Sequence, residues 1–268
     1  MKRIGIIAGN GQFPLIFSKK AKSKGYGVYA AAYVKEADPA LKKHVEVMEW
    51  LHLGQLKKLV RFFHKNDVKE AVMMGGITKT RMFTNVRPDI AAISLFARMK
   101  STHDDGILRA FADYLEKEGI KIISATFLLP ELLADPGCWT KRKPAKNETA
   151  DIDMGWDLAK EIGKLDIGQS IVVAGGSVMA VEAIDGTDAT ILRGGLLSEG
   201  QAVVVKICKP NQDIRFDMPS VGLGTIETMQ KAGAKVLALE AGRTIVFDKE
   251  SMIALADSSR ISIVGIEK

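Results

Sequence analysis

The segment from Glu182 to Arg193 carries the densest set of groups that could do chemistry. It reads Glu-Ala-Ile-Asp-Gly-Thr-Asp-Ala-Thr-Ile-Leu-Arg, and it gathers three carboxylates, a hydroxyl and a guanidinium around Gly186. The apolar run before it predicts two strands joined by a glycine turn, so Glu182 falls near a strand end. We expect Thr187 to cap a short helix that ends near Leu192. Carboxylates such as Glu182, Asp185 and Asp188 can bind a hard cation there, and the helix N-terminus can bind an anion.

A second acidic stretch, residues 213–222, follows further along the chain and reads Asp-Ile-Arg-Phe-Asp-Met-Pro-Ser-Val-Gly. We predict a short strand over residues 214–216, whose alternation turns Arg215 and Asp217 to the same side. Asp217 at that strand end could ligate a divalent cation or orient a water, or it could simply cap the next helix. We expect the two acidic segments to meet at one site for phosphate chemistry.

Two glycine turns offer a different kind of anion site. Residues 3–8 predict a buried strand, and the turn after it leads into a helix whose first turn suits Pro14. The residues of this first turn are Gly9, Asn10, Gly11 and Gln12, and the second turn, after a predicted strand near residues 70–74, contains Gly75, Gly76 and Lys79. A strand, a glycine turn and a helix N-terminus in this order are typical of nucleotide phosphate sites.

The first turn also leaves open an NAD-binding interpretation. Glu36 follows the second predicted strand and could bind a ribose. The dinucleotide fingerprint is incomplete, however, because Pro14 stands where its third glycine should be. A purely structural turn from strand to helix is the simplest alternative.

The larger pattern predicts an α/β protein. In the first half, strands alternate with helices, which indicates a Rossmann-like parallel sheet with helices on both faces. The expected strands lie near residues 28–34, 45–50, 70–74 and 121–127, and the expected helices near residues 55–65, 89–100 and 104–118. Ligands bind such sheets at the carboxyl ends of the strands, where both glycine turns should lie.

The second half has a different order and predicts a mixed α/β domain of unknown topology. Proline and glycine before residue 137 interrupt the alternation, so we place the domain boundary between residues 137 and 138. The basic stretch at residues 140–146 is interpreted as a solvated linker or as a cationic strip beside a phosphate or an anionic bilayer.

Composition narrows the classes of function. The net charge of +6 fits an anionic ligand or membrane surface, whereas the aromatic and basic pattern of single-strand nucleic-acid binders is missing. Cys138 and Cys208 form no metal or disulfide spacing, which indicates a reducing compartment. The apolar run at the N-terminus is too short for a signal peptide. We therefore expect a cytoplasmic protein that contacts a membrane only peripherally.

Several motifs resemble those of the LpxI-type UDP-2,3-diacylglucosamine pyrophosphatases. The resemblance runs in order from about residue 4 to about residue 265, so it covers nearly the whole chain. It rests on Gly5-Ile-Ile-Ala-Gly-Asn-Gly-Gln-Phe-Pro14, Leu165-Asp-Ile-Gly-Gln169, Val181-Glu-Ala-Ile-Asp-Gly-Thr-Asp188 with Arg193, and Arg215-Phe-Asp-Met-Pro-Ser-Val-Gly222 with Thr225 and Ile226.

The resemblance implies a Mg²⁺-dependent hydrolase of lipid A biosynthesis. Such an enzyme would cleave the diphosphate of UDP-2,3-diacylglucosamine into UMP and 2,3-diacylglucosamine 1-phosphate (lipid X). It further implies a UDP-binding domain at residues 1–137, a lipid-binding domain at residues 138–268 and a homodimer. The family's essential aspartate corresponds to Asp217.

Our hypothesis from the sequence assigns catalysis to Asp217, Asp188 and Glu182, with Asp217 and Asp188 holding Mg²⁺. The two glycine turns, Thr187, Arg193 and Arg215 would bind the substrate. Two rival functions remain: an NAD-dependent oxidoreductase, and a carrier of lipids or nucleotide sugars without catalysis. The clustered acids argue against the carrier, because carboxylates beside a diphosphate require a cation.

Overall fold

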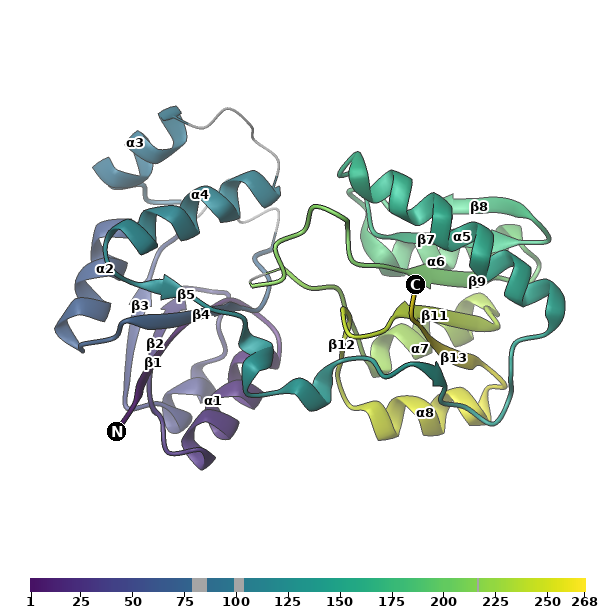
Figure 1. Cartoon of the computed structure of the whole chain (residues 1–268), viewed down its shortest axis with the longest axis horizontal. Helices are drawn as coiled ribbons and strands as arrows, with labels where there is room; N and C mark the ends of the chain where they lie inside the picture. Colours follow the sequence, from purple (N-terminus) through teal and green to yellow (C-terminus); the bar gives the residue numbers. More distant parts are fainter. Residues whose placement is uncertain (79–85, 99–103, 216) are drawn as a thin grey trace. The chain divides into compact units, whose positions relative to one another are not determined.

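The computed structural model describes residues 1–78, 86–98, 104–215 and 217–268 (Figure 1). The chain forms two compact units. The first comprises Met1–Pro130 together with Asp213–Asp217, and the second comprises Glu131–Gln212 and Met218–Lys268. The sequence suggested two uninterrupted domains, so the grouping of Asp213–Asp217 with the first unit was not foreseen.

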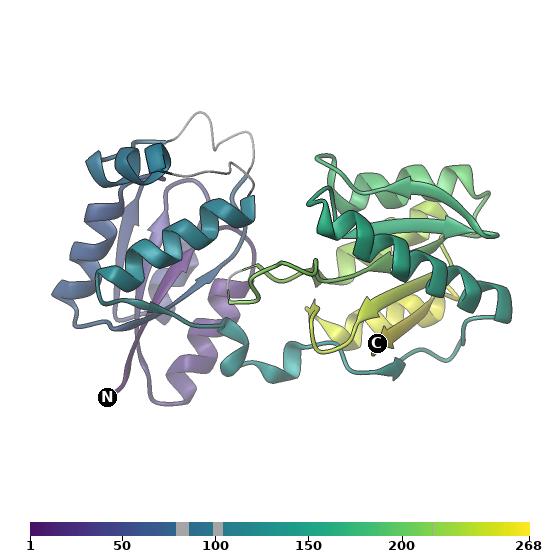
Figure 2. The same cartoon turned by 45° about the horizontal axis from the view of Figure 1, so that its top comes forward.

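The first unit contains a parallel sheet, as predicted. Its strands follow the order β3-β2-β1-β4-β5, so the chain runs outward from β1 on one side and then returns to continue on the other. Figure 2 shows the helices on both faces of this sheet. The strands are β1 (Arg3–Ala8), β2 (Gly27–Tyr33), β3 (Val47–Leu51), β4 (Glu70–Met74) and β5 (Lys121–Ile122), and the helices are α1 (Phe13–Ser23), α2 (Leu56–Lys65), α3 (Ile90–Arg98) and α4 (Asp104–Lys117), with a 3-10 helix at Pro39–His44.

Helix α2 shows how closely this unit is packed. A Cβ atom on Gly5 of β1 would lie 2.7 Å from the ring of Phe63, so only glycine fits beneath α2 at this point. The predicted apolar face of α2 is buried, with Leu59 and Phe63 almost fully enclosed. The hydrophobic period of α2 therefore identified the face that packs on the sheet.

Strand β5 is shorter than predicted. It ends at Ile122, whereas the sequence suggested a strand through residue 127. A 3-10 helix forms at Ala125–Phe127 instead, because the side chain of Ser124 accepts a hydrogen bond from the N–H of Thr126 at 3.3 Å. Such local side-chain bonds compete with strand formation.

The second unit contains the predicted mixed sheet. Its order is β6-β13-β11-β9-β7-β8, in which β9, β11 and β13 run parallel while β7 pairs antiparallel with β8 and β9. A separate parallel pair joins β10 and β12. The strands are β6 (Gly137–Cys138), β7 (Ser170–Ala174), β8 (Ser177–Val181), β9 (Val203–Lys206), β10 (Ser220–Val221), β11 (Val236–Glu240), β12 (Ile245–Val246) and β13 (Ser262–Ile266), and the helices are α5 (Lys146–Lys164), α6 (Gly186–Leu197), α7 (Leu223–Ala232) and α8 (Lys249–Ser258), with a 3-10 helix at Pro130–Leu132.

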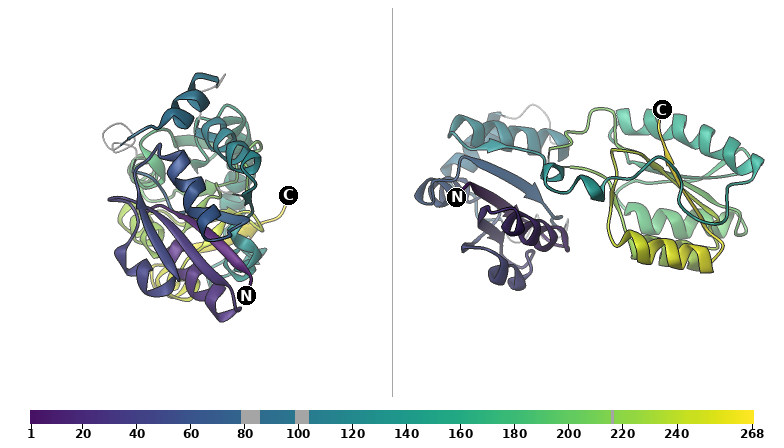
Figure 3. Two further views of the ribbon diagram at one scale, coloured as in Figure 1. Left: turned by 90° about the vertical axis from the view of Figure 1, so that its left-hand side faces the viewer. Right: turned by 60° about the horizontal axis from the view of Figure 1, so that its bottom comes forward.

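Alternate residues of this sheet face two separate cores. Val203 and Val205 of β9 pack with Trp156 of α5, whereas Val204 packs with Ile191 of α6 and with α7 and α8. The side-chain period of two along a strand produces this division. Helix α5 therefore covers one face of the sheet and the other three helices cover the opposite face (Figure 3, right).

Helix α6 is longer than predicted. It continues to Leu197, beyond the expected end near Leu192, although Gly194 and Gly195 usually weaken helices. A Cβ atom on Gly194 would lie 2.5 Å from the Val172 side chain, and one on Gly195 would lie 2.5 Å from that of Ala232. These glycines allow close packing inside the helix, and they do not mark its end.

Among the described residues, no helix has both the length and the apolar character that a bilayer span requires.

Candidate functional site

The two glycine loops of the first unit contact each other, as their positions after β1 and β4 predicted. The N–H of Gly9 donates to the carbonyl of Met74 at 2.9 Å, and the N–H of Asn10 donates to the carbonyl of Gly76 at 2.8 Å. Strands β1 and β4 are neighbours at the point where the strand order reverses. Open parallel sheets bind their ligands at this kind of switch point.

Glycine is required at this contact because the two backbones nearly touch. A Cβ atom on Gly9 would lie 2.3 Å from the carbonyl oxygen of Gly76, and one on Gly75 would lie 2.3 Å from that of Asn10. Gly75 also has a φ of 81°. The following residue, Gly76, donates its N–H to Oδ1 of Asn10 at 3.1 Å, so the loops form one rigid structure.

Glu36, which follows β2, ties both loops together. Its Oε2 accepts hydrogen bonds from Nδ2 of Asn10 at 3.0 Å, from Oγ1 of Thr78 at 2.9 Å and from the N–H of Thr78 at 3.3 Å. The carboxylate is buried. Glu36 therefore positions the loops, which is a different role from the ribose contact that the NAD interpretation required.

Helix α1 starts directly after the first loop. Gln12 occupies its N-cap position without a capping bond from its side chain, and Pro14 lies in the first turn, as predicted. The first turn contains no acidic residue. The positive end of the helix dipole thus adjoins the loop Gly9–Gln12, and together they could bind a diphosphate.

In the second unit, the start of α6 is held by a chain of buried polar side chains. Oγ1 of Thr187 donates to Oε1 of Glu182 at 2.8 Å and accepts from Nζ of Lys206 at 3.0 Å. Glu182 and Lys206 are both buried. The prediction that Thr187 caps α6 is wrong, because Asp185 occupies the N-cap position and the Thr187 hydroxyl links Glu182 to Lys206 instead.

Arg193 is already paired within the same segment. It donates through Nη1 to Oδ2 of Asp185 at 2.5 Å and through Nη2 to the carbonyl of Val181 at 2.9 Å. The hydrogen bond from Arg193, aided by one from the N–H of Ala183, lowers the pKa of Asp185. Asp188, in the first turn of α6, is exposed to solvent.

The segment Asp213–Asp217 forms a turn, so the predicted strand over residues 214–216 is wrong. The N–H of Asp217 donates to the carbonyl of Asp213 at 3.1 Å, and the Asp213 carboxylate accepts the N–H of Arg215 at 3.1 Å. Aspartate favours such turns because its side chain bonds the backbone two residues on. The strand alternation that placed Arg215 beside Asp217 therefore does not apply. Phe216 lies outside the described residues.

Arg215 attaches this turn to the first unit. Its Nε and Nη2 donate to Asp213 at 3.0 and 2.7 Å, and its Nη1 donates to Oε1 of Glu116 in α4 at 2.9 Å. The bond from Arg215 lowers the pKa of Asp213, while the bond from Asp213 raises that of Arg215. Oγ of Ser124, just after β5, also donates to the carbonyl of Ile214 at 3.5 Å. The turn thus lies beside the last turn of α4 and the residues that follow β5.

Comparison with known proteins assigns the chain to a family. A family model described as the LpxI N-terminal domain matches residues 3–132, and one described as the LpxI C-terminal domain matches residues 135–264. A Caulobacter vibrioides protein named UDP-2,3-diacylglucosamine pyrophosphatase LpxI is 32% identical over 278 residues, which cover 100% of this chain and 98% of that protein. The chain belongs to the LpxI family.

Solved structures add only distant likenesses to this LpxI-family assignment. A phosphoribosylglycinamide synthetase from Anaerococcus prevotii is 14% identical with a TM-score of 0.28, covering 71% of this chain and 42% of that one. An N5-carboxyaminoimidazole ribonucleotide synthetase from Thermotoga maritima is also 14% identical, with a TM-score of 0.25, covering 68% and 42%. The chain spans less than half of either structure, and scores this low support no functional conclusion.

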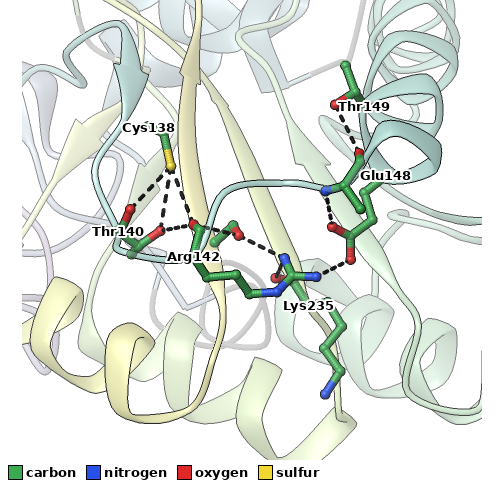
Figure 4. Close-up of polar contacts among 8 residues, drawn as sticks. Cys138, Thr140, Arg142, Glu148, Thr149 and Lys235 are labelled. Carbon is green, nitrogen blue, oxygen red and sulfur yellow. Dashed lines mark hydrogen bonds and ion pairs between the residues drawn. The ribbon is translucent and has the colours of Figure 1, made fainter.

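The basic stretch of this LpxI-family chain is anchored through Arg142, while its lysines, Lys141, Lys143 and Lys146, are exposed (Figure 4). Nη2 of Arg142 donates to Oε1 of Glu148 at 2.5 Å, and its Nη1 donates to Oγ of Ser262 at 2.8 Å. The Ser262 hydroxyl donates in turn to the carbonyl of Arg142 at 2.9 Å, as does Oγ1 of Thr140 at 3.0 Å. Arg142 therefore anchors the chain between β6 and α5 to β13.

The structure brings some predicted site residues of the LpxI-family chain together and leaves others untested. The glycine loops adjoin each other, and Thr187 contacts Glu182. Asp217 groups with the first unit while Glu182 and Asp188 belong to the second, so their convergence stays a prediction. Lys79 lies outside the described residues. Across the described parts of the chain, no group of three or more His, Cys, Asp or Glu side chains is placed to hold a metal ion.

Three residues near these sites were missed or misread from the sequence. Glu36 was considered only as a ribose ligand, Thr78 only as a hydroxyl of the second glycine turn, and Lys206 was not singled out. Only Lys206 left a usable signal, since it is a lysine at the end of the otherwise apolar strand β9. A buried lysine in such a position requires polar partners.

Proposed function

We propose that this LpxI-family chain is a hydrolase of lipid A biosynthesis that cleaves UDP-2,3-diacylglucosamine into UMP and 2,3-diacylglucosamine 1-phosphate. The observation that carries the proposal is the 32% identity over the whole chain to a pyrophosphatase named for this substrate. The contact between the glycine loops at the switch point of a parallel sheet supports it. Because the N–H groups of Gly9, Asn10 and Gly76 bond within the loops, the N-terminus of helix α1 beside them would provide the phosphate donors.

The reaction needs only water as the second substrate. The oxygen of water attacks one phosphorus, the bond from that phosphorus to the bridging oxygen breaks, and the bridging oxygen leaves on the other phosphate. One proton from the water passes to solvent. The first unit would bind the UDP portion through Gly9–Gln12, Gly75 and Gly76, and the second unit would bind the acyl chains.

The acidic residues have distinct roles in this proposal. Asp217 orients the attacking water, and Asp188 and Glu182 assist. Arg193 contacts a phosphate oxygen, because the Arg193–Asp185 pair is exposed and the arginine can exchange the carboxylate for a phosphate at little cost. Thr187, whose hydroxyl bonds Glu182 and Lys206, contacts the phosphate through its backbone N–H at the start of α6. Arg215 is bound to two carboxylates, and it therefore serves chiefly to hold the turn that carries Asp217.

Two of the predicted carboxylates would suit a loosely held Mg²⁺. This ion is usually bound through one or two carboxylates together with substrate phosphates and waters. Asp188 is exposed on the first turn of α6, and Asp217 is partly exposed. We expect these two residues to hold Mg²⁺, which would neutralise charge on the diphosphate oxygens. We also expect a homodimer in the cytoplasm that contacts the inner membrane peripherally.

The direct test is to incubate purified protein with UDP-2,3-diacylglucosamine, with Mg²⁺ or with a chelator, and to measure UMP by chromatography. UMP release that requires Mg²⁺ is the expected result. Repeating the reaction in ¹⁸O-water identifies the phosphorus attacked, because the label enters that product. The absence of UMP over a range of pH and metal ions would refute the hydrolase; tight binding without turnover would favour a carrier, and fluorescence changes with NADH would favour an oxidoreductase.

The proposed role of Asp217 has its own test. We expect Asp217→Ala to lose most turnover while it still binds the substrate. Asp153→Ala is a suitable control, because Asp153 is an exposed aspartate of α5 that pairs with Lys268. Full activity in Asp217→Ala would place the catalytic group elsewhere.

A further inference from the structure

Helix α3 exposes a row of large apolar side chains. Ile90, Ile93 and Phe96 are 75%, 57% and 50% exposed, and their spacing of three places them on one broad side of the helix. The opposite side carries Ala92, which is fully buried in the core of the first unit. A surface helix normally turns only polar residues to solvent. The outer side of α3, whose position Figure 1 shows, therefore has the character of an interaction surface.

A cationic pocket lies on the neighbouring helices. Lys57, Arg61 and Lys65 of α2 are exposed. Together with Tyr114 of α4 and Glu118, just beyond the end of α4, they line a surface pocket of about 450 Å³. Within the part of the chain that the structure describes, none of these three cations forms an ion pair. An unneutralised group of this kind favours an anionic partner.

Asp89 connects the pocket to the apolar row. Its Oδ1 accepts the N–H of Ala92 at 3.0 Å and so caps α3, while its Oδ2 accepts the N–H of Lys57 at 2.7 Å. Burial raises the pKa of Tyr114, and the nearby carboxylates of Glu118 and Asp89 raise it further. Asp89 thus lies close to both features, so the start of the apolar row adjoins the cations.

A second apolar row, on α6, has the opposite electrostatic surroundings. Leu192 and Leu196 are 44% and 80% exposed. The exposed Arg193 of that helix is paired with Asp185, and its other exposed charged neighbours are Asp188 and, just beyond the end of the helix, Glu199. Their negative charge would repel an anionic surface. Of these two rows, the one on α3 therefore combines apolar side chains with cations that form no ion pair among the described residues.

We propose that the α2–α3 face, consisting of Lys57, Arg61, Lys65, Ile90, Ile93 and Phe96, docks on a bilayer that contains anionic phospholipids. The apolar side chains enter the boundary between headgroups and acyl chains, and the cations contact the lipid phosphates. This inference deepens the proposed function, because a diacylated substrate is presented to the enzyme by such a bilayer.

Sedimentation with vesicles tests the docking without any substrate, so its result is independent of UMP release. The purified protein is mixed with vesicles of phosphatidylcholine alone or of phosphatidylcholine with phosphatidylglycerol, at low and high salt. We expect binding to the anionic vesicles only, weakened by salt because salt screens exposed charges. Ile93→Glu and the double variant Lys57→Glu/Arg61→Glu should both lose binding, by about fivefold or more for each cation changed.

Leu196→Glu is the matched control, because it introduces the same charge at an exposed apolar position on α6, where the leucine is even more exposed than Ile93. It should bind vesicles like the unaltered protein. Circular dichroism verifies that each variant is folded. The variant on α3 tests the apolar contact with the bilayer, and the double variant on α2 independently tests the contact of the cations with lipid phosphates. The proposal is wrong if the unaltered protein does not bind anionic vesicles, if both variants bind normally, or if Leu196→Glu alone loses binding. It is also wrong if Ile93→Glu only converts a dimer into a monomer, since the face would then join two copies of the chain.

Discussion

The carboxyl edge of the first sheet and the start of α6 both gather groups suited to phosphate chemistry, but different forces hold them. At the first sheet, two backbones approach so closely that only glycine fits at Gly9 and Gly75. At α6, side chains provide the structure, through the series Glu182, Thr187 and Lys206. Open space surrounds Gly186 at this second place.

This difference predicts opposite sensitivities. Backbone contacts leave no room for an added atom, yet they do not depend on the charge of a neighbouring side chain. A buried network of hydrogen bonds between charged and hydroxyl groups tolerates added volume at its periphery. It is strongly destabilised when one of its members is removed, because the remaining groups lose their partners. The first site should therefore be sensitive to size and the second to polarity.

The largest expected effect comes from Gly75→Ala compared with Gly186→Ala. The two glycines have nearly identical φ angles, 81° and 82°. Alanine at either position adds a backbone strain of about 1 kcal/mol. At Gly75 the new methyl also meets the Asn10 carbonyl, which brings the total loss to about 3 to 4 kcal/mol. Urea denaturation measures the unfolding free energy of both variants. If both lost the same amount, the two glycine loops could move apart without destabilising the protein.

Thr187→Val and Thr78→Val test the polarity of the two sites at constant shape. Thr187 joins buried Glu182 to buried Lys206, so its valine variant should lose about 3 kcal/mol of unfolding free energy. Thr78→Val should lose only about 1 kcal/mol, since Glu36 keeps its bonds from Asn10 and from the Thr78 backbone.

Serine at each position restores the hydroxyl and serves as the control for these two variants. Thermal denaturation compares the four proteins. If Thr78→Val lost more stability than Thr187→Val, Glu36 would depend more on its threonine partner than Glu182 does. That result would reverse the comparison.

Local patterns in the sequence predicted much of the fold. The alternation of elements gave the parallel sheet and placed both glycine loops on one edge, because strand direction alone determines that edge. The hairpin of β7 and β8 followed from two apolar runs around Gly175 and Gly176. These features depend on neighbours in the chain, so a single sequence reveals them.

The contacts that organise the candidate site are long-range, and this is why they were missed. Arg215 reaches Glu116 across 99 positions, and Glu36 reaches Thr78 across 42. The sequence showed Asp213 and Arg215 only as members of an alternating run, whereas the Asp213 side chain closes a turn on its own backbone. Arg142 was similarly misread, because its partner Ser262 lies 120 positions away.

The smallest expected effect concerns acid stability and compares Asp213 with Asp185. Each carboxylate has a pKa lowered by a hydrogen bond from an arginine, Arg215 or Arg193. Because the folded pKa lies below the unfolded value of about 3.9, each pair stabilises the protein above that pH, and the stabilisation is lost as the pH falls through the folded pKa. Asp213→Asn should therefore lower the unfolding free energy at neutral pH and flatten its decline in acid. Asp185→Asn should change little, because its ion pair is exposed and salt screens it. Urea midpoints measured from about pH 6 down to about pH 3, at low and high salt, distinguish the two variants. If Asp185→Asn removes the loss of stability in acid and Asp213→Asn leaves it intact, the stronger ion pair is the one on α6.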